Sequence, residues 1–219
     1  MGQMQSANIM GVVLAGGRSQ RMGGREKALI DLAGEPMLAH ILQRFGPQVG
    51  ALAINANGDP ERFTTFSLPV IADLVPDFPG PLAGILAGLR WAIAARSGAT
   101  HIATVSSDAP FIPLDLVARL AEAAMAAGGG IAVAQSSGKP QPVVGLWPLG
   151  IADELEATLA TGERRVHRWV EMQGSEIVDF APMEIGGRTI DPFFNVNTLA
   201  DLAEAETLMQ LIGRNKDRA

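Results

Sequence analysis

The chain of 219 residues is 47% hydrophobic and 18% charged, and its formal net charge is −6. This composition is typical of one globular domain with a sizeable core, and the acidic balance argues against nucleic acid as a partner. Cysteine is absent, which excludes disulfides, cysteine-bound metal ions and thiolate nucleophiles.

An apolar stretch lies at 7–17, but no lysine or arginine precedes Arg18. A secretory signal peptide has a positively charged region ahead of its apolar core. The best candidate for a membrane span, 82–95, contains Arg90 and is shorter than the ~20 residues that cross a bilayer. We therefore expect a cytoplasmic protein that does not enter membranes.

Short apolar runs alternate with helical periodicity along the chain. Runs of strand length lie at 10–14, 51–55, 70–73, 101–106, 131–134, 143–147 and 177–180. Apolar residues recur at helical spacing within 82–93, 114–125, 151–159 and 202–212. This alternation predicts an α/β fold, a three-layer sandwich around a mostly parallel, Rossmann-like sheet. In such a sheet, ligands bind beyond the carboxyl ends of the strands.

The loop after the first predicted strand combines glycines with cations. Its members are Gly16, Gly17, Gly23, Gly24, Arg18, Arg21, Arg25 and Lys27. Backbone N–H groups at a strand-to-helix turn bind phosphate, and glycines let the phosphate approach closely. Neither the Walker pattern nor the G-x-G-x-x-G fingerprint occurs here. A glycine turn with a solvated basic surface is the alternative, but Arg21 and Lys27 favour phosphate.

A carboxylate stands at the end of another predicted strand. The stretch HIATVSSDAPFIP, 101–113, brings Asp108 to that end, ahead of Pro110 and Pro113. One carboxylate near a phosphate loop suits Mg²⁺, which completes its coordination with phosphate oxygens and water. The alternative is a cap for the next helix, but Asp108 lies several residues too early. We therefore expect Asp108 to be a magnesium ligand.

The segment GERRVHRWV, 162–170, concentrates positive charge. It carries Arg164, Arg165 and Arg168 together with Trp169. The segment is either a solvated helix face or the site of an anionic or ring-bearing second substrate.

The loop DFPGPLAG, 77–84, precedes a helix with Gly84 and Gly88 four residues apart. Close packing of the helix against the sheet is the interpretation we favour for Gly88. The glycines from Gly80 to Gly84 could instead shape a pocket wall.

Together these motifs resemble those of the molybdenum cofactor guanylyltransferases (MobA), within the nucleotidyltransferase superfamily. The first, LAGGRSQRMGGREKALIDLAGEPML, is similar to the L-A-G-G-x-x-x-R-M-G signature of many nucleotidyltransferases. Further similarities are INAN at 54–57, Asp73, FPGPLAGILAGL at 78–89, SSDAPFIPLDL at 106–116, GERRV at 162–166 and FNVNTLADL at 194–202. The first motif alone indicates a nucleotidyltransferase, whereas its combination with GERRV and NVNT is specific.

The resemblance implies transfer of GMP from GTP to the terminal phosphate of molybdopterin, with release of pyrophosphate. The nucleophile would be a phosphate oxygen that is already ionised, so no general base is required. The implied cofactor is Mg²⁺, and Asp108, Lys27 and Arg21 would help it to screen the repulsion between two anions. Molybdoenzymes or their chaperones would receive the product.

The resemblance also implies roles for individual residues. The GTP-binding residues are Leu14, Ala15, Gly16, Gly17, Lys27, Asn55, Asp73 and Asp108. The catalytic residues are Arg21, Lys27 and Asp108, of which Asp108 binds the metal. The acceptor-binding residues are Asn195 and Asn197, and we expect Arg164 and Arg165 beside them because the acceptor phosphate needs cations. Gln141 stands where some members of the family have histidine, so any role of an imidazole at that position is open.

We expect one domain over 1–219. Residues 9–135 form its nucleotide-binding part, 136–212 its acceptor-binding part, and 213–219 a polar tail that frays.

The two acceptor segments are expected to face one another across a cleft beside the triphosphate site. The alternative is structural: Thr198 caps the last helix, and the arginines pair with Glu163 or Glu171.

Other functions are open at this point. Cytidylyl relatives usually have alanine where this chain has Gly16, and a methyl group there would narrow the floor beneath the base. Gly16 therefore favours a purine, and a related enzyme that uses CTP or another phosphorylated acceptor is the alternative. A non-catalytic nucleotide-binding module would be expected to lack Asp108 or Lys27, and both are present.

Overall fold

The computed structural model describes residues 8–16, 26–74 and 80–216. Seven strands in these ranges form a central sheet in the order β5-β4-β1-β6-β8-β7-β9. They are β1 (Ile9–Leu14), β4 (Ala51–Asn55), β5 (Val70–Ile71), β6 (His101–Ser106), β7 (Ala132–Ser136), β8 (Lys139–Pro148) and β9 (Glu176–Asp179). Strand β8 is antiparallel to β6 and β7, and the other pairs are parallel. The mostly parallel α/β sheet is confirmed, and each predicted apolar run overlaps one of these strands.

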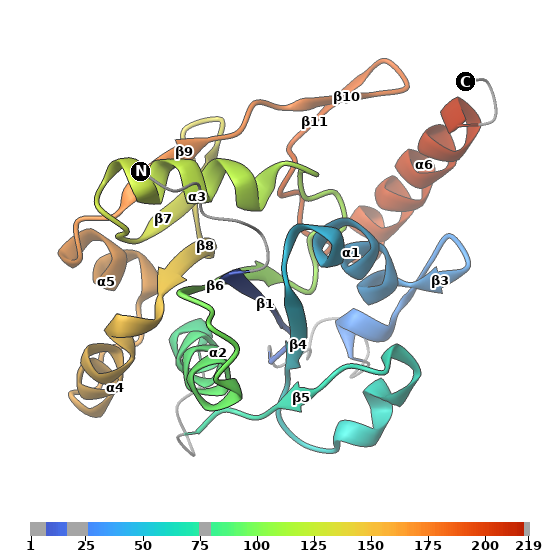
Figure 1. Ribbon diagram of the computed structural model, residues 1–219. Helices are drawn as coiled ribbons and strands as arrows, with labels where there is room; N and C mark the ends of the chain where they lie inside the picture. The colour runs from blue at the N-terminus through green and yellow to red at the C-terminus, as the bar shows by residue number, and fades with distance from the viewer. Residues whose placement is uncertain (1–7, 17–25, 75–79, 217–219) are drawn as a thin grey trace.

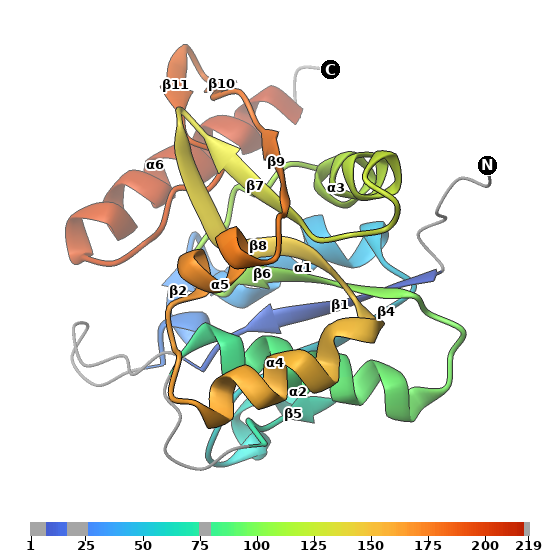
Figure 2. The same ribbon diagram turned by 90° about the vertical axis from the view of Figure 1, so that its left-hand side faces the viewer.

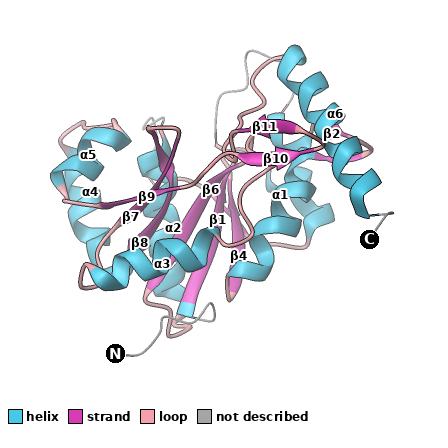
Figure 3. Cartoon of the chain, turned by 90° about the horizontal axis from the view of Figure 1, so that it is seen from above, coloured by secondary structure: helices cyan, strands magenta, loops and turns pink. Residues whose placement is uncertain are grey.

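Helices cover both faces of the sheet (Figures 1 and 2). One face carries α2 (Pro81–Ala95), α4 (Ala152–Ala160) and α5 (Val166–Met172), and the other carries α1 (Met37–Phe45) and α3 (Leu116–Ala126). Helix α6 (Leu199–Lys216) contacts β2 and β10, and Figure 3 shows it on the far side of the molecule from α4 and α5. The shorter elements are η2 (Lys27–Leu29), β2 (Asp31–Leu32), β3 (Glu35–Pro36), η3 (Gly46–Gln48), η4 (Pro60–Phe66), η5 (Leu149–Ile151), β10 (Met183–Ile185) and β11 (Arg188–Ile190).

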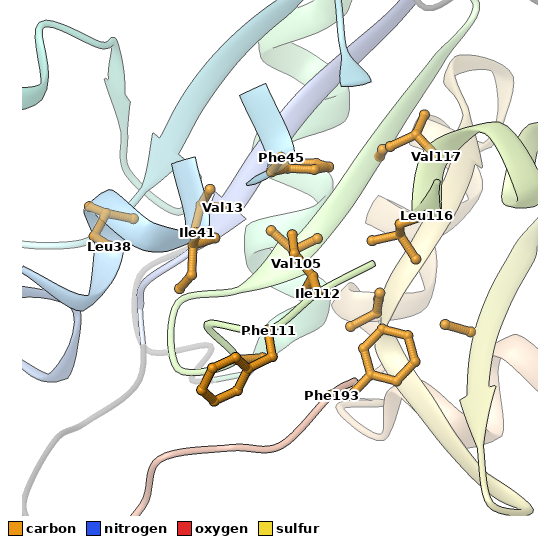
Figure 4. Close-up of a cluster of buried hydrophobic side chains, with 14 of the residues drawn as sticks. Val13, Leu38, Ile41, Phe45, Val105, Phe111, Ile112, Leu116, Val117 and Phe193 are labelled. Atoms are coloured by element: carbon orange, nitrogen blue, oxygen red, sulfur yellow. The ribbon is translucent and has the colours of Figure 1, made fainter. Parts of the chain in front are cut away.

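Strand alternation divides the buried side chains into two clusters. Val13 belongs to the cluster on the α1 and α3 face, where it lies near Ile41 and Val105 (Figure 4). Its neighbour Val12 points to the α2 face. A Cβ atom added at Gly88 of α2 would lie 2.8 Å from Val12 Cγ2, which is closer than atoms can approach. The prediction that Gly88 lets its helix pack closely on the sheet is therefore confirmed.

The start of α3 differs from the predicted helix at 114–125. The helix begins at Leu116, and Leu114 is 67% exposed. The side chain of Gln48 explains the shift, because its Nε2 donates to Pro113 O (2.9 Å) and its Oε1 accepts from Val117 N (2.9 Å). These bonds hold the chain in a turn before the helix and satisfy the N–H of Val117 from another element.

The last helix is longer than its apolar pattern predicted. It continues to Lys216, so 213–216 are helical and not part of a frayed polar tail. Gly213 does not end it, since glycine is tolerated within a helix at a modest cost. No helix within the described ranges has both the length and the apolar character that a membrane crossing requires.

Candidate active site

The carboxyl ends of three neighbouring strands meet at one edge of the sheet. Leu14, the last residue of β1, is in register with Asn55 of β4 and Ser106 of β6. Backbone pairing continues past this point, since Ala15 N donates to Asn55 O (2.8 Å) and Ser107 N donates to Leu14 O (3.1 Å). The candidate residues of the nucleotide-binding part therefore start from adjacent strand ends, where ligands of such sheets bind.

Asn55 and Asp73 belong to one hydrogen-bonded network at this edge. Asn55 is 2% exposed, and its Nδ2 donates to Asp73 Oδ1 (2.9 Å) and Ile71 O (3.1 Å). Asn57 Nδ2 donates to Asp73 Oδ2 (2.7 Å), and Asn57 Oδ1 accepts from Asp73 N (2.9 Å). Amide groups thus engage both carboxylate oxygens of Asp73 and fix its orientation. Asn57 was not assigned to the site from the sequence, although its place in the INAN motif is a signal that could have done so.

The amide oxygen of Asn55 faces two glycines. A Cβ atom added at Gly84 would lie 2.3 Å from Asn55 Oδ1, and one added at Gly16 would lie 3.6 Å from it. The first separation is a clash and the second is ordinary van der Waals contact. Gly84 therefore gives the Asn55 side chain its room, whereas a methyl group at Gly16 would only touch the same atom.

Arg62 ties the Asn55–Asp73 network to the residue before Lys27. Its guanidinium donates to Asn57 O, and its Nη1 forms an ion pair with Glu26 Oε2 at 3.3 Å. Its Cζ lies over the ring of Phe63, 5.0 Å from the ring centroid. Burial raises the pKa of Glu26, and the charge of Arg62 opposes that rise. Neither Arg62 nor Glu26 was assigned to the site from the sequence, because no motif or periodicity relates two positions so far apart.

Lys27, Asp108 and Asn197 come together on the adjoining side of the edge. Lys27 Nζ lies 3.5 Å from Asp108 Oδ2 and donates to Asn197 Oδ1 (2.6 Å). Ser106 Oγ donates to Asp108 Oδ1 (2.5 Å), and Val196 N donates to Asp108 O (2.8 Å). The structure therefore joins a residue expected at the phosphates, a residue expected at the metal and a residue expected at the acceptor.

The segment with Asn195 and Asn197 is fixed by the cap of α6. Asp201 Oδ2 accepts from Asn197 N (2.9 Å) and Thr198 N (2.8 Å), and Thr198 Oγ1 accepts from Asp201 N (3.1 Å). This reciprocal pair is a capping box, so Thr198 caps the last helix as the structural alternative had it. The N–H of Asn197, followed by the bonds from Thr198, lowers the pKa of Asp201. Val196 is fully buried, while Asn195 is half-buried and Asn197 exposed.

A single carboxylate organises the cationic segment before α5. Glu163 Oε1 accepts from the backbone N–H groups of Arg164 and Arg165 (both 3.0 Å) and from Arg165 Nε (3.3 Å). Glu163 Oε2 lies 3.4 Å from Arg168 Nη1. The backbone N–H of Arg165, then its side chain, then the N–H of Arg164 lower the pKa of Glu163 to about 2. The structural alternative, in which an arginine pairs with Glu163, therefore holds for Arg165, whose side chain is 58% exposed.

Trp169 does not share the exposure of these arginines. Its side chain is fully buried and stacks on Trp147 with ring centroids 5.9 Å apart. The interpretation in which Trp169 offers a surface to a ring-bearing substrate is therefore wrong. The alternative interpretation of this segment as a helix is correct for Val166–Met172, but the sheet beneath that helix takes the Trp169 ring into the core.

Comparisons with known proteins identify the family of this chain. The model of the MobA-like NTP transferase domain matches residues 11–177. The chain belongs to this family, and it is a nucleotidyltransferase. It is 50% identical over 204 residues to a molybdenum cofactor guanylyltransferase of Mesorhizobium japonicum, covering 93% of this chain and 97% of the relative. A relative of the same name from Rhodopseudomonas palustris is 48% identical over 198 residues, covering 90% and 92%.

Solved structures of low sequence identity share the fold of this family member. The molybdopterin-guanine dinucleotide biosynthesis protein A of Archaeoglobus fulgidus superposes with a TM-score of 0.69 at 23% identity, covering 92% of this chain and 98% of that one. The fold of this chain thus belongs to a known architecture.

Two candidate residues of this MobA-like chain, Gly17 and Arg21, lie outside the described residues, as do Arg18, Gly23, Gly24 and Arg25. Gln141 is described and pairs with Ala134 within the sheet. Within 8–16, 26–74 and 80–216, no three or more histidine, aspartate and glutamate side chains gather in a group that could hold a metal ion. A metal held by Asp108 would accordingly need other oxygen ligands, as Mg²⁺ commonly obtains from phosphate and water.

Proposed function

We propose that this chain transfers GMP from GTP to the terminal phosphate of molybdopterin and releases pyrophosphate. Two relatives that it matches over nine-tenths or more of its length are molybdenum cofactor guanylyltransferases. The structural observation that carries the proposal is the contact of Lys27 with both Asp108 and Asn197. It connects the expected triphosphate site with the expected acceptor site.

The chemistry requires charge to be neutralised more than protons to be moved. An acceptor phosphate oxygen forms a bond to the α-phosphorus of GTP, and the bond from that phosphorus to the bridging oxygen of the β-phosphate breaks. The electron pair leaves with pyrophosphate. Because the attacking oxygen is already ionised, a general base is unnecessary, and preorganised cations supply the stabilisation. Within the residues that the structure describes, Lys27 is proposed as the cation in this role. Arg21 is proposed beside it from the sequence.

The donor atoms at the site fit Mg²⁺. Asp108 Oδ2 and Asn197 Oδ1 both approach the ammonium group of Lys27, so two oxygens already converge on one cation. Hard oxygen donors, including one carboxylate, are the ligands that Mg²⁺ takes from proteins when phosphates and water complete its shell. Asp108 and Asn197 would hold the ion, and the ion would neutralise charge on the α-phosphate and on the leaving pyrophosphate.

The remaining candidate residues divide between the two substrates. Leu14, Ala15, Gly16 and Gly17 are proposed at the guanine and ribose, with Asn55 and Asp73 as further GTP contacts. Gly16 carries no side chain beside Asn55 Oδ1, where a Cβ atom would lie 3.6 Å away, and this supports the larger purine there. Arg164, Arg165, Asn195 and Asn197 are proposed at molybdopterin, because arginines bind phosphate and amide groups can recognise the edges of a pterin.

The expected reaction also indicates where the protein acts. Its product, a guanine dinucleotide of the cofactor, would be passed to molybdoenzymes or their chaperones. Both substrates are soluble metabolites, which is consistent with the cytoplasm.

The test compares the four nucleotides. The protein is incubated with Mg²⁺, molybdopterin and each NTP in turn, and pyrophosphate and dinucleotide are measured. We expect GTP to be preferred over CTP by at least about tenfold, and Gly16→Ala to reduce this preference. The added methyl group meets only van der Waals contacts, so the variant should fold normally and report on the base. Equal use of GTP and CTP by the native protein would favour a cytidylyl enzyme.

A further inference from the structure

The ammonium group of Lys27 contacts both of the oxygens that are proposed to bind the metal ion. Its Nζ is 2.6 Å from Asn197 Oδ1 and 3.5 Å from Asp108 Oδ2. The Lys27 and Asp108 side chains are only 18% and 20% exposed. One ammonium group therefore satisfies two oxygens that belong to opposite parts of the chain.

The other carboxylate oxygen of Asp108, Oδ1, is already engaged and does not replace Oδ2 as a ligand for the metal ion. Oδ1 accepts a hydrogen bond from Ser106 Oγ at 2.5 Å, which orients the carboxylate and leaves Oδ2 as the oxygen that faces the cation. A Mg²⁺ ion binds oxygen at about 2.1 Å. An ion at that distance from Oδ2 and from Asn197 Oδ1 would stand within a few ångströms of the lysine charge. At such separations, the repulsion between two cations is large wherever solvent is partly excluded.

We infer that Lys27 and the divalent cation compete for Asp108 Oδ2 and Asn197 Oδ1, so that the metal binds tightly only when the triphosphate draws Lys27 away. This inference rests on the proposed function, in which Lys27 contacts phosphate. The nucleotide supplies a better partner for the ammonium group and at the same time supplies metal ligands. Lys27 thus makes metal binding depend on nucleotide binding, a role distinct from its contact with phosphate.

The inference predicts that a substitution at Lys27 raises the affinity for the metal ion instead of lowering it. Loss of a residue needed for catalysis should strengthen metal binding in the absence of nucleotide. Mn²⁺ serves as the probe, because it accepts the same octahedral oxygen ligands and its free ion is measured by electron paramagnetic resonance. The protein is titrated with Mn²⁺ without nucleotide, as native chain and as Lys27→Met, which keeps most of the side-chain volume. We expect the dissociation constant to fall about tenfold in Lys27→Met.

Three further variants make the result specific. Lys27→Arg retains a positive charge and should bind Mn²⁺ as weakly as the native protein. Lys139→Met removes an exposed lysine at the start of β8 and should leave the affinity unchanged. Adding Asp108→Asn to Lys27→Met should abolish the gain, because the ion loses its carboxylate. Circular dichroism verifies that each variant is folded.

The outcomes separate the inference from the proposed function. Equal Mn²⁺ affinities of Lys27→Met and the native protein would overturn the competition, even if the native enzyme makes the dinucleotide with GTP. The competition is also overturned if the gain persists in Lys27→Met with Asp108→Asn, or if Lys139→Met produces an equal gain. Failure of the native protein to form dinucleotide and pyrophosphate would instead count against the proposed function, whatever the Mn²⁺ titrations give.

Discussion

The nucleotide-binding part and the acceptor-binding part hold their candidate residues in different ways. In the first part, Asn55 ends β4 and Asp73 and Asp108 closely follow β5 and β6, so the parallel sheet itself places them. In the second part, the candidate residues lie on two connections, ahead of α5 and α6. A single carboxylate holds each connection by accepting two successive backbone N–H groups.

These two carboxylates, Glu163 and Asp201, are alike in their electrostatics. Backbone N–H groups lower the pKa of both. The difference between the parts shows what fixes the positions of the site residues in each. A site built on strand ends is preorganised by the core, whereas a site built on capped connections depends on a few exposed hydrogen bonds. Substitutions in the first part should therefore cause larger losses than substitutions in the second.

The largest effect is expected at Asp108. Asp108→Asn keeps the shape of the side chain and can still accept the bond from Ser106, but an amide is a poor ligand for Mg²⁺. Turnover should fall by about 100-fold or more, measured as pyrophosphate release at saturating GTP, molybdopterin and Mg²⁺. Asp153→Asn is the control, because that side chain is 90% exposed and remote from the site. Native-like turnover of Asp108→Asn would place the metal elsewhere.

A smaller but selective effect is expected at Gly84. In Gly84→Ala, the new Cβ would lie 2.3 Å from Asn55 Oδ1, so Asn55 must move and its bond to Asp73 must weaken. The KM for GTP should rise about tenfold, with little change in the KM for molybdopterin. Gly213→Ala is the matched control, since it is also a helical glycine but its Cβ would meet no atom within 4 Å. An unchanged KM for GTP in Gly84→Ala would remove the Asn55 network from the nucleotide site.

The acceptor part is tested by Arg165→Ala and Asn195→Ala. Each should raise the KM for molybdopterin by about three- to tenfold, as expected for one polar contact, while GTP binding stays the same. Arg168→Ala is the control, because Arg168 pairs with the same Glu163 and is similarly exposed, 54% against 58% for Arg165. If Arg168→Ala and Arg165→Ala weaken molybdopterin binding equally, the effect belongs to general positive charge and not to a defined contact.

The smallest effect is expected at Glu163 and depends on pH. The folded pKa of about 2 lies below the ordinary value of 4.5, so ionised Glu163 stabilises the fold fully above about pH 4.5. That contribution is lost as the pH falls towards about 2. Urea unfolding should therefore show a native advantage over Glu163→Gln near pH 6 that shrinks below about pH 4.5 and disappears only below about pH 2. An advantage independent of pH would show that the carboxylate charge does not hold the segment.

Much of the fold follows from local pattern. Strands such as β1 and β6 are buried on both faces, and buried parallel strands are written as continuous apolar runs. Asp108 was recognised as a candidate because such a run leads directly to it. Local pattern failed where a distant side chain determined the local structure, as when Gln48 delays the start of α3. It also failed for Trp169, because the arginines around it in the sequence do not say that the sheet will cover its ring.

The sequence by itself determined the strands, most of the helices, and the glycines, cations and carboxylate that indicate a nucleotidyltransferase. These features depend on neighbours within a few residues, so they can be read along the chain. Only the tertiary structure decided that Lys27 would meet Asn197 across 170 positions, that Arg62 would reach Glu26 and that β8 would reverse direction between β6 and β7. Such contacts result from strand order and from packing of the two core clusters, and the free energy that selects them is spread over the whole core. No single segment of sequence contains them.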